Sequence, residues 1–249
     1  LLGGAVRDKI RVYAHWGITN LSDETLSRAK ERLDYLQKNG YTMFKSGPAG
    51  QWRGHESPAV IDKFVECASL MREWVGPEIE LAFDFHGKMN PALAIEICNE
   101  IKHIRPMFVE EPVPQENIDA LKLVSDHVPF PIATGERLLS RWDFREVIEK
   151  QAAAYLQPDI GRCGGVTEWI KIAQLAEQHD LQLTSHLLHE LSVCLIAAFP
   201  SGYQVEFMNF FEYTPFTQDF SVRDGYLMVP ECFGHGVEFT NTAKKLYAA

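Results

Sequence analysis

The chain has 249 residues, a length that one α/β barrel of roughly 250 residues fills as a single unit. With 46% of its residues apolar and 23% charged, it holds enough apolar material for a core and lacks the composition of a disordered chain. The formal net charge of −10 argues against a nucleic-acid or anionic-membrane partner, because either partner would need a basic face.

Short apolar runs, rich in branched and aromatic residues, alternate with longer segments of helical period from residue 10 onward. The apolar runs predict eight strands, at 10–15, 41–46, 80–85, 107–110, 131–134, 154–157, 182–185 and 204–211. The longer segments predict helices at 23–39, 57–75, 91–103, 117–126, 141–150, 166–179 and 189–198. Every strand except the last is therefore followed by a helix.

This regular alternation predicts the fold. Eight parallel strands joined by helices can form an open sheet or close into a barrel, and the regular count favours closure into a (β/α)8 TIM barrel. Neither G-x-G-x-x-G nor a P-loop follows the first strand. We expect residues 1–213 to form the barrel, and residues 214–249 to form a loop-rich C-terminal segment with two short strands.

Ionisable residues stand where the predicted strands end, which is where barrel enzymes place their active sites. The third strand ends in Asp84 and His86, two residues apart, so both side chains project to the same face. The strands that follow end in MFVEEP, GER, LQPDI, QLTSH and NFFEY. The acids and histidine in these strand ends recur every 23 to 27 residues, a spacing that matches one βα unit and predicts a ring around one opening.

Three successive strand ends in this ring carry a carboxylate, namely Asp84, one of Glu110 and Glu111, and Glu136. Each acid alone reads as an ordinary surface carboxylate or helix cap. All three in step would repel one another unless a hard cation lay between them, and oxygen-only ligands favour Mg²⁺ over zinc. Strand parity alone does not choose between Glu110 and Glu111.

Several segments resemble, in order and spacing, the mandelate racemase branch of the enolase superfamily, most closely its acid-sugar dehydratases of the galactonate dehydratase type. They are LLGGAVRDKIRVY, DFHGK, FVEEP, GER, LQPDIGRCGGVTE and SHLLHE, and the match spans nearly the whole chain. The resemblance implies that Asp84, Glu110 and Glu136 bind Mg²⁺. Members of this branch also carry an N-terminal α+β capping domain, which we expect to be absent from this chain.

The resemblance also implies individual roles around the metal. His186, oriented by Asp159, would remove the proton next to a carboxylate, and Mg²⁺ would stabilise the enediolate that forms. His86 would protonate the departing hydroxyl of the neighbouring carbon. Lys45 would neutralise the substrate carboxylate, and Glu212 would hydrogen-bond that carboxylate or the enediolate. The expected product is the 2-keto-3-deoxy acid of an aldonate or aldarate.

Three other functions compete with dehydration. A racemase or epimerase of a 2-hydroxy acid would use the same metal and His186, but racemases of this branch resemble one another in a K-x-K at the second strand, where this chain reads FKSGP. A non-catalytic barrel would be favoured by the loss of a metal ligand, and all three are intact. A metal-dependent amidohydrolase would need H-x-H at the first strand, where Tyr13, Ala14 and His15 stand.

The remaining composition bears on compartment and partners. The five cysteines contain no C-x-x-C pair, which argues against a disulfide framework or zinc knuckle and predicts a reduced, cytoplasmic setting. No apolar run reaches the roughly 18 residues of a membrane helix. We expect the protein to be a homo-oligomer. We also expect it to act on a small acid-sugar substrate, since a bound dication inverts the local electrostatic field and lets an acidic protein accept an anion.

Overall fold

Eight parallel strands close into a barrel in the computed structural model, which describes residues 2–47, 52, 55–208, 215–232 and 234–247. The strands are β1 (Lys9–His15), β2 (Met43–Ser46), β3 (Glu80–Asp84), β4 (Phe108–Glu110), β5 (Ile132–Thr134), β6 (Tyr155–Leu156), β7 (Gln182–Ser185) and β8 (Gly202–Phe207). Each strand pairs in parallel with the next, and β1 pairs with both β8 and β2. The barrel predicted from the sequence is confirmed.

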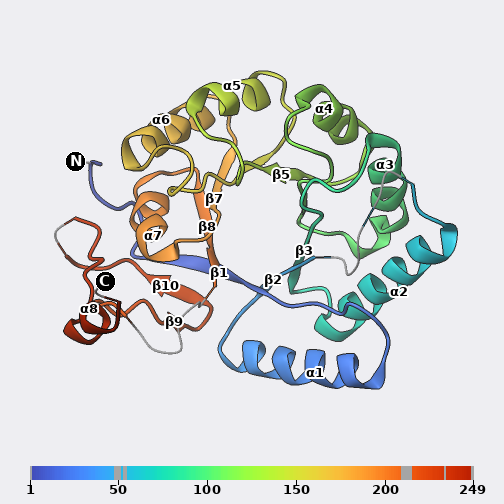
Figure 1. The fold of residues 1–249 in the computed structure, drawn as a ribbon, viewed down its shortest axis with the longest axis horizontal. Coiled ribbons are helices and arrows are strands. Elements are labelled where there is room, and N and C mark those ends of the chain that lie inside the picture. Colours follow the sequence, from blue (N-terminus) through green and yellow to red (C-terminus); the bar gives the residue numbers. More distant parts are fainter. Residues whose placement is uncertain (1, 48–51, 53–54, 209–214, 233, 248–249) are drawn as a thin grey trace.

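Helices surround the strands as an outer ring, which Figure 1 shows down the barrel. They are α1 (Asp23–Lys38), α2 (Pro58–Val75), α3 (Pro91–Glu100), α4 (Ile118–His127), α5 (Arg141–Glu149), α6 (Val166–Glu177) and α7 (His189–Ala198). Their starts follow from local chemistry, because Ser22 and Asn90 each accept a hydrogen bond from a backbone N–H of the first turn. The predicted helix 91–103 ends earlier, at Glu100, and continues as a short 3-10 turn, Lys102–Ile104.

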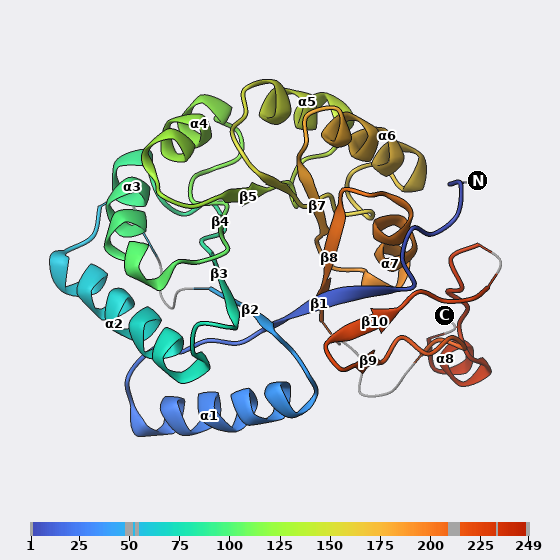
Figure 2. The same ribbon diagram turned by 180° about the vertical axis from the view of Figure 1, so that it is seen from behind.

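The segment after β8 extends the sheet on the outside of the barrel. β10 (Tyr226–Met228) pairs antiparallel with β1, and β9 (Val222–Arg223) pairs with β10. Figures 1 and 2 show both strands between α7 and α1, with α8 (Asn241–Tyr247) farther out. The division of the chain at residue 213 stays a prediction.

The barrel interior is filled by side chains that alternate along the strands. Its inner apolar layer takes one residue from each of the first five strands: Tyr13, Met43, Ala82, Phe108 and Ala133. The next inward-facing position on a strand lies two residues farther on, because side chains of a strand alternate between its two faces. This apolar layer therefore forms the floor beneath the polar residues of the barrel mouth. None of the helices in the described part of the chain is both long and apolar enough to cross a bilayer.

Candidate active site

The strands deliver polar side chains directly above the apolar floor. Asp84 stands two residues after Ala82 on β3, and Glu110 stands two residues after Phe108 on β4. Asp84 and Glu110 are also partners in the register of the two strands. Strand pairing thus places two carboxylates side by side at the carboxyl end of the barrel.

The third carboxylate reaches the mouth through a glycine turn. Glu136 follows β5 after Gly135, whose φ is 136°, in a region that L side chains rarely adopt. A Cβ on Gly135 would lie 2.8 Å from the Phe144 ring and 2.9 Å from the Gln157 backbone nitrogen. Only glycine fits here, and the G-E pair of the sequence follows from that requirement.

The three carboxylates predicted as ligands come together. Asp84, Glu110 and Glu136 are all buried, and each offers an oxygen within 4.8 Å of the others'. Burial, followed by the nearby charge of Asp84, raises the pKa of Glu110 well above its usual range. A divalent cation among these oxygens would favour the charged forms instead, and an all-oxygen set suits Mg²⁺. The residues therefore fit the ion that the sequence predicts.

Lys45 is buried against this cluster from β2. Its Nζ lies 3.0 Å from Glu110 Oε2, 2.8 Å from Glu206 Oε1 and 3.5 Å from Asp84 Oδ2. Burial acts to lower the pKa of Lys45, but Glu110 and Glu206 outweigh it and hold that pKa well above its usual value. Lys45 is consequently a permanent cation beside the carboxylates, able to attract an anionic group.

His186, at the end of β7, forms a dyad with Asp159. Its Nδ1 lies 2.7 Å from Asp159 Oδ2, and its Nε2 lies 3.3 Å from Glu136 Oε2. Burial acts to raise the pKa of Asp159, but hydrogen bonds from His186 and from the Gly161 N–H hold it below its usual value. When the ring is neutral, a charged Asp159 favours the proton on Nδ1, which leaves the Nε2 lone pair on the side of the metal cluster.

His86 approaches the cluster from the other side. It follows β3, and in a ring of eight strands β3 lies opposite β7, which carries His186. Its Nδ1 lies 3.3 Å from Asp84 Oδ1, and its side chain is 46% exposed. His86 thus lies beside Asp84 and His186 beside Glu136, so each imidazole contacts a different carboxylate of the cluster.

A further acid, Glu206 on β8, is missing from the predicted site. Its side chain is 1% exposed and contacts Lys45, while its Oε1 also lies 2.6 Å from His15 Nε2. Its Oε2 accepts a hydrogen bond from the Leu187 N–H at 3.0 Å. Burial acts to raise its pKa, but Lys45 and the His15 hydrogen bond hold the pKa far below its usual range.

The predicted eighth strand, 204–211, explains why Glu206 was missed. The spacing of about 26 residues pointed to Glu212, which lies outside the described residues, so its role stays a prediction. The chain from His186 returns to the mouth in only 20 residues, because β8 ends at Phe207 beside the end of β1. The signal available in the sequence was Gln204 and Glu206, two polar residues on one face of an otherwise apolar strand.

Glu111, the alternative ligand, lies apart from the three carboxylates. Its backbone takes a φ of 39°, and its buried side chain lies 2.8 Å from Arg137 Nη1. Burial, together with the charge of Glu136, raises the pKa of Glu111 to about 8. The left-handed turn after β4 thus separates two adjacent glutamates, with Glu110 toward the metal cluster and Glu111 toward Arg137.

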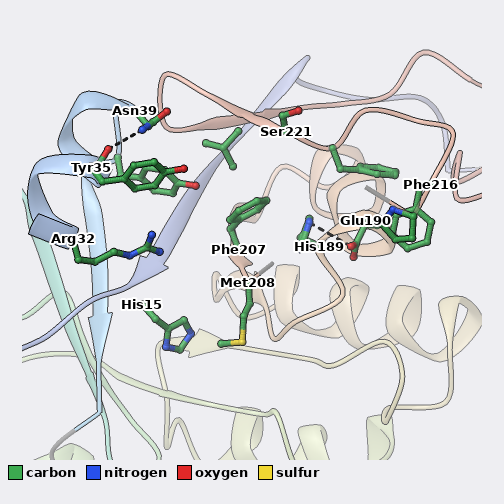
Figure 3. Close-up of a pocket in the computed structure, with 14 residues that line it drawn as sticks. His15, Arg32, Tyr35, Asn39, His189, Glu190, Phe207, Met208, Phe216 and Ser221 are labelled. Atoms are coloured by element: carbon green, nitrogen blue, oxygen red, sulfur yellow. Dashed lines mark hydrogen bonds and ion pairs between the residues drawn. The ribbon is translucent and has the colours of Figure 1, made fainter. Parts of the chain in front are cut away.

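A pocket of about 600 Å³ lies beside this site and touches it only at His15. Figure 3 shows His15 and Met208 at one end, and Tyr35 and Asn39 of the α1 region at the other. His189 also lines it, with a pKa that burial lowers to about 4. The three clustered carboxylates and the His186–Asp159 dyad are not among the residues that line this pocket.

Comparison with known proteins agrees with this geometry. The family model for enolase C-terminal domain-like proteins matches residues 27–243. D-galactonate dehydratase of Ralstonia pickettii (strain 12J) is 32% identical over 96% of this chain, which spans 65% of that protein. The solved L-talarate dehydratase of Polaromonas sp. JS666, complexed with Mg and L-glucarate, superposes with a TM-score of 0.83 at 27% identity, over 98% of this chain and 65% of that one. A mandelate racemase/muconate lactonizing enzyme-like protein from Roseovarius sp. TM1035 superposes with a TM-score of 0.88 at 31% identity, over 98% of this chain and 66% of that one.

Proposed function

Because the chain belongs to the enolase C-terminal domain-like family, we propose that it catalyses the Mg²⁺-dependent dehydration of an acid sugar to a 2-keto-3-deoxy acid. The observation that carries this proposal is a cluster of three buried carboxylates with two histidines beside it, His86 against Asp84 after β3 and His186 against Glu136 after β7. One imidazole can take a proton while the other gives one. The dehydratases of Ralstonia and Polaromonas, similar over nearly the whole chain, support an aldonate or aldarate as the substrate class.

The first task of the site is to bind a carboxylate beside the metal. Asp84, Glu110 and Glu136 would hold Mg²⁺, which when bound stabilises the negative charge that develops on the substrate carboxylate. Lys45 Nζ, buried and cationic, would attract the same carboxylate. Glu206 keeps Lys45 in place and, through His15, joins β8 to β1 at the mouth.

The second task is to move two protons. His186 Nε2 would remove the proton from the carbon next to the carboxylate, and the electron pair of that C–H bond would move toward the carboxylate. His86 would donate a proton to the hydroxyl on the neighbouring carbon, the C–O bond would break and water would leave. The resulting enol then takes up a proton on the carbon that lost the hydroxyl and releases the proton of its own hydroxyl to give the keto acid, so the net change is the loss of one water molecule.

A racemase is the second candidate, and the end of the second strand weighs against it. Racemisation needs a base on each face of the α-carbon. The racemases of this branch resemble one another in a K-x-K at the second strand, where this chain reads FKSGP. It keeps Lys45 but has Gly47 in place of the second lysine, so one of the two lysines is missing.

The proposed function is tested by incubating the Mg²⁺-loaded protein with a panel of aldonates and aldarates. We expect one or a few of them to yield a 2-keto-3-deoxy acid, measured as its carbonyl derivative. The variant Asp84→Asn, which removes a charge from the metal cluster, should yield none. Inversion of the α-carbon without keto acid would support the racemase, and a panel without product or exchange would contradict both activities.

Loss of metal ligands is expected to weaken Mg²⁺ binding directly. Each of Asp84→Asn, Glu110→Gln and Glu136→Gln keeps the side-chain shape but removes one negative ligand, and we expect Mg²⁺ affinity to fall at least ~10-fold in isothermal titration. Glu168→Gln is the control, since Glu168 pairs with Arg141 on the outer helices. If all three variants bound Mg²⁺ with the wild-type affinity, Asp84, Glu110 and Glu136 would not be the metal ligands.

A further inference from the structure

Arg137 links three strand ends at the barrel mouth. It follows Glu136 after β5, and its Nε lies 3.4 Å from Glu136 Oε1. Its Nη1 lies 2.8 Å from Glu111 Oε2, after β4. The same Nη1 donates a hydrogen bond at 3.0 Å to the backbone carbonyl of His86, after β3. One guanidinium therefore contacts the segments that follow β3, β4 and β5.

The peptide unit that follows His86 is held at both of its polar atoms. Its carbonyl oxygen accepts the bond from Arg137, and its N–H, which belongs to Gly87, donates to the Glu111 carbonyl at 2.7 Å. The N–H of His86 itself donates to Asp84 Oδ1 at 2.9 Å. The backbone on both sides of the His86 Cα is thus fixed by hydrogen bonds.

This backbone needs such support because it is strained. His86 has a φ of 52° and Gly87 a φ of 66°, and the left-handed region is unfavourable for a residue with a Cβ such as histidine. Packing around the turn is also close, since a Cβ on Gly87 would lie 3.1 Å from Arg137 Nη1. Surrounding contacts must stabilise the turn, and Arg137 supplies a charged one.

Glu111 explains why Arg137 stays in place. Its side chain is 1% exposed, and no described residue donates a hydrogen bond to either carboxylate oxygen. Arg137 is the only cation within ion-pairing distance of it in the described part of the chain. A buried carboxyl group without a polar partner is costly whether or not it is ionised, so Glu111 and Arg137 hold each other through this 2.8 Å contact.

We propose that Arg137, held by Glu111, is a positioning residue that aims the His86 imidazole at the leaving hydroxyl. The proposal rests on the proposed function, in which His86 is the acid. Asp84, at 3.3 Å, is the only ion-pair partner of the half-exposed ring among the described residues, so the direction of the ring depends on the backbone turn. Arg137 acts through that turn and touches neither proton that moves.

The variant Arg137→Met tests this, because it keeps a long side chain but removes the donors. With the acid sugar that the wild type dehydrates fastest, at saturating Mg²⁺ in deuterium oxide, we expect dehydration to fall ~10²-fold, as misplacement of a catalytic group does. The rate of α-proton exchange depends on His186, so its loss should be at least ~10-fold smaller than the loss of the dehydration rate. Arg137→Lys, which restores the charge, should recover part of the loss. Arg141→Met is the matched control, since Arg141 pairs with Glu168 at similar exposure and should leave both rates unchanged.

A crystal structure of the Arg137→Met protein gives a second readout that does not depend on activity. We expect the His86–Gly87 peptide to leave its left-handed conformation and the His86 ring to move. An unmoved peptide and ring would overturn the proposal whether or not any acid sugar is a substrate. Equal losses of dehydration and exchange would also overturn it, because they would show a general effect on the site. If the wild type processes no acid sugar, the proposed function fails, and the structure of the variant still decides the positioning role.

Discussion

Replacement of His186 by Asn is expected to abolish dehydration and, with it, the exchange of the substrate α-proton with solvent deuterium. Its Nε2 lies 3.3 Å from Glu136 Oε2, beside the metal cluster, and Asp159 at 2.7 Å holds the proton on Nδ1. Loss of a general base costs typically 10²–10⁴-fold, so both rates should fall by at least ~10²-fold. Proton NMR in deuterium oxide measures both on one sample.

The control for this variant is His179→Asn, an exposed histidine after α6 that should leave both rates unchanged. Unfolding temperatures and Mg²⁺ affinity should match the wild type for both proteins, because Asn fills much of the imidazole volume and His186 is not a metal ligand. Exchange at the wild-type rate in His186→Asn would assign the base to another residue.

The sequence predicted the barrel well because its signals are local and repeat. Each strand is a short apolar run and each helix has its own period and caps, so eight strands and seven helices were found within a few residues of their bounds. The same regularity predicted a carboxylate at the end of β3 and another at the end of β4, because parallel strands in register bring equivalent positions to one edge. The choice of Glu110 over Glu111 came from the family resemblance and not from the spacing. Residues that recur at the same position of each βα unit therefore lie close together in the folded barrel.

Glu206 shows where that regularity fails. The predicted eighth strand followed the average spacing of the unit, but β8 starts directly after α7 and a short turn, and a register shift against β7 sets which of its residues face inward. The number of residues in one βα unit does not fix the number in the next. The position of β8 depends instead on its pairing with β1, which is far away in the sequence.

The contacts of Arg137 could not be predicted for another reason. Its partners are a side chain after β4 and a carbonyl after β3, so the interaction depends on left-handed turns at His86 and Glu111. Neither residue type predicts such a turn by itself, because only a few per cent of non-glycine residues have a positive φ, even though histidine is enriched among them. Turn geometry at non-glycine residues therefore has to be seen in the structure.

Replacement of His86 by Asn is expected to separate the two proton transfers. Dehydration should fall by ~10²-fold or more, since a general acid contributes typically 10²–10⁴-fold to the step it serves. Exchange of the α-proton should continue near the wild-type rate, because His186 lies on the opposite strand and keeps its partner Asp159. The measurement is proton NMR in deuterium oxide on the wild type, the variant and His179→Asn.

The result of this experiment also distinguishes a dehydratase from a racemase. In a dehydratase, His86→Asn leaves an enediolate that returns its proton to the same face, so deuterium enters with retention of configuration and no keto acid appears. In a racemase that used His86 as its second base, the wild type would invert the α-carbon without losing water, and the variant would stop inverting. The second strand supplies only Lys45, because Gly47 stands where the second lysine of the racemase K-x-K would be. Full dehydration by His86→Asn would refute the acid role, since the proton for the leaving hydroxyl would then have to come from a residue other than the imidazole beside Asp84.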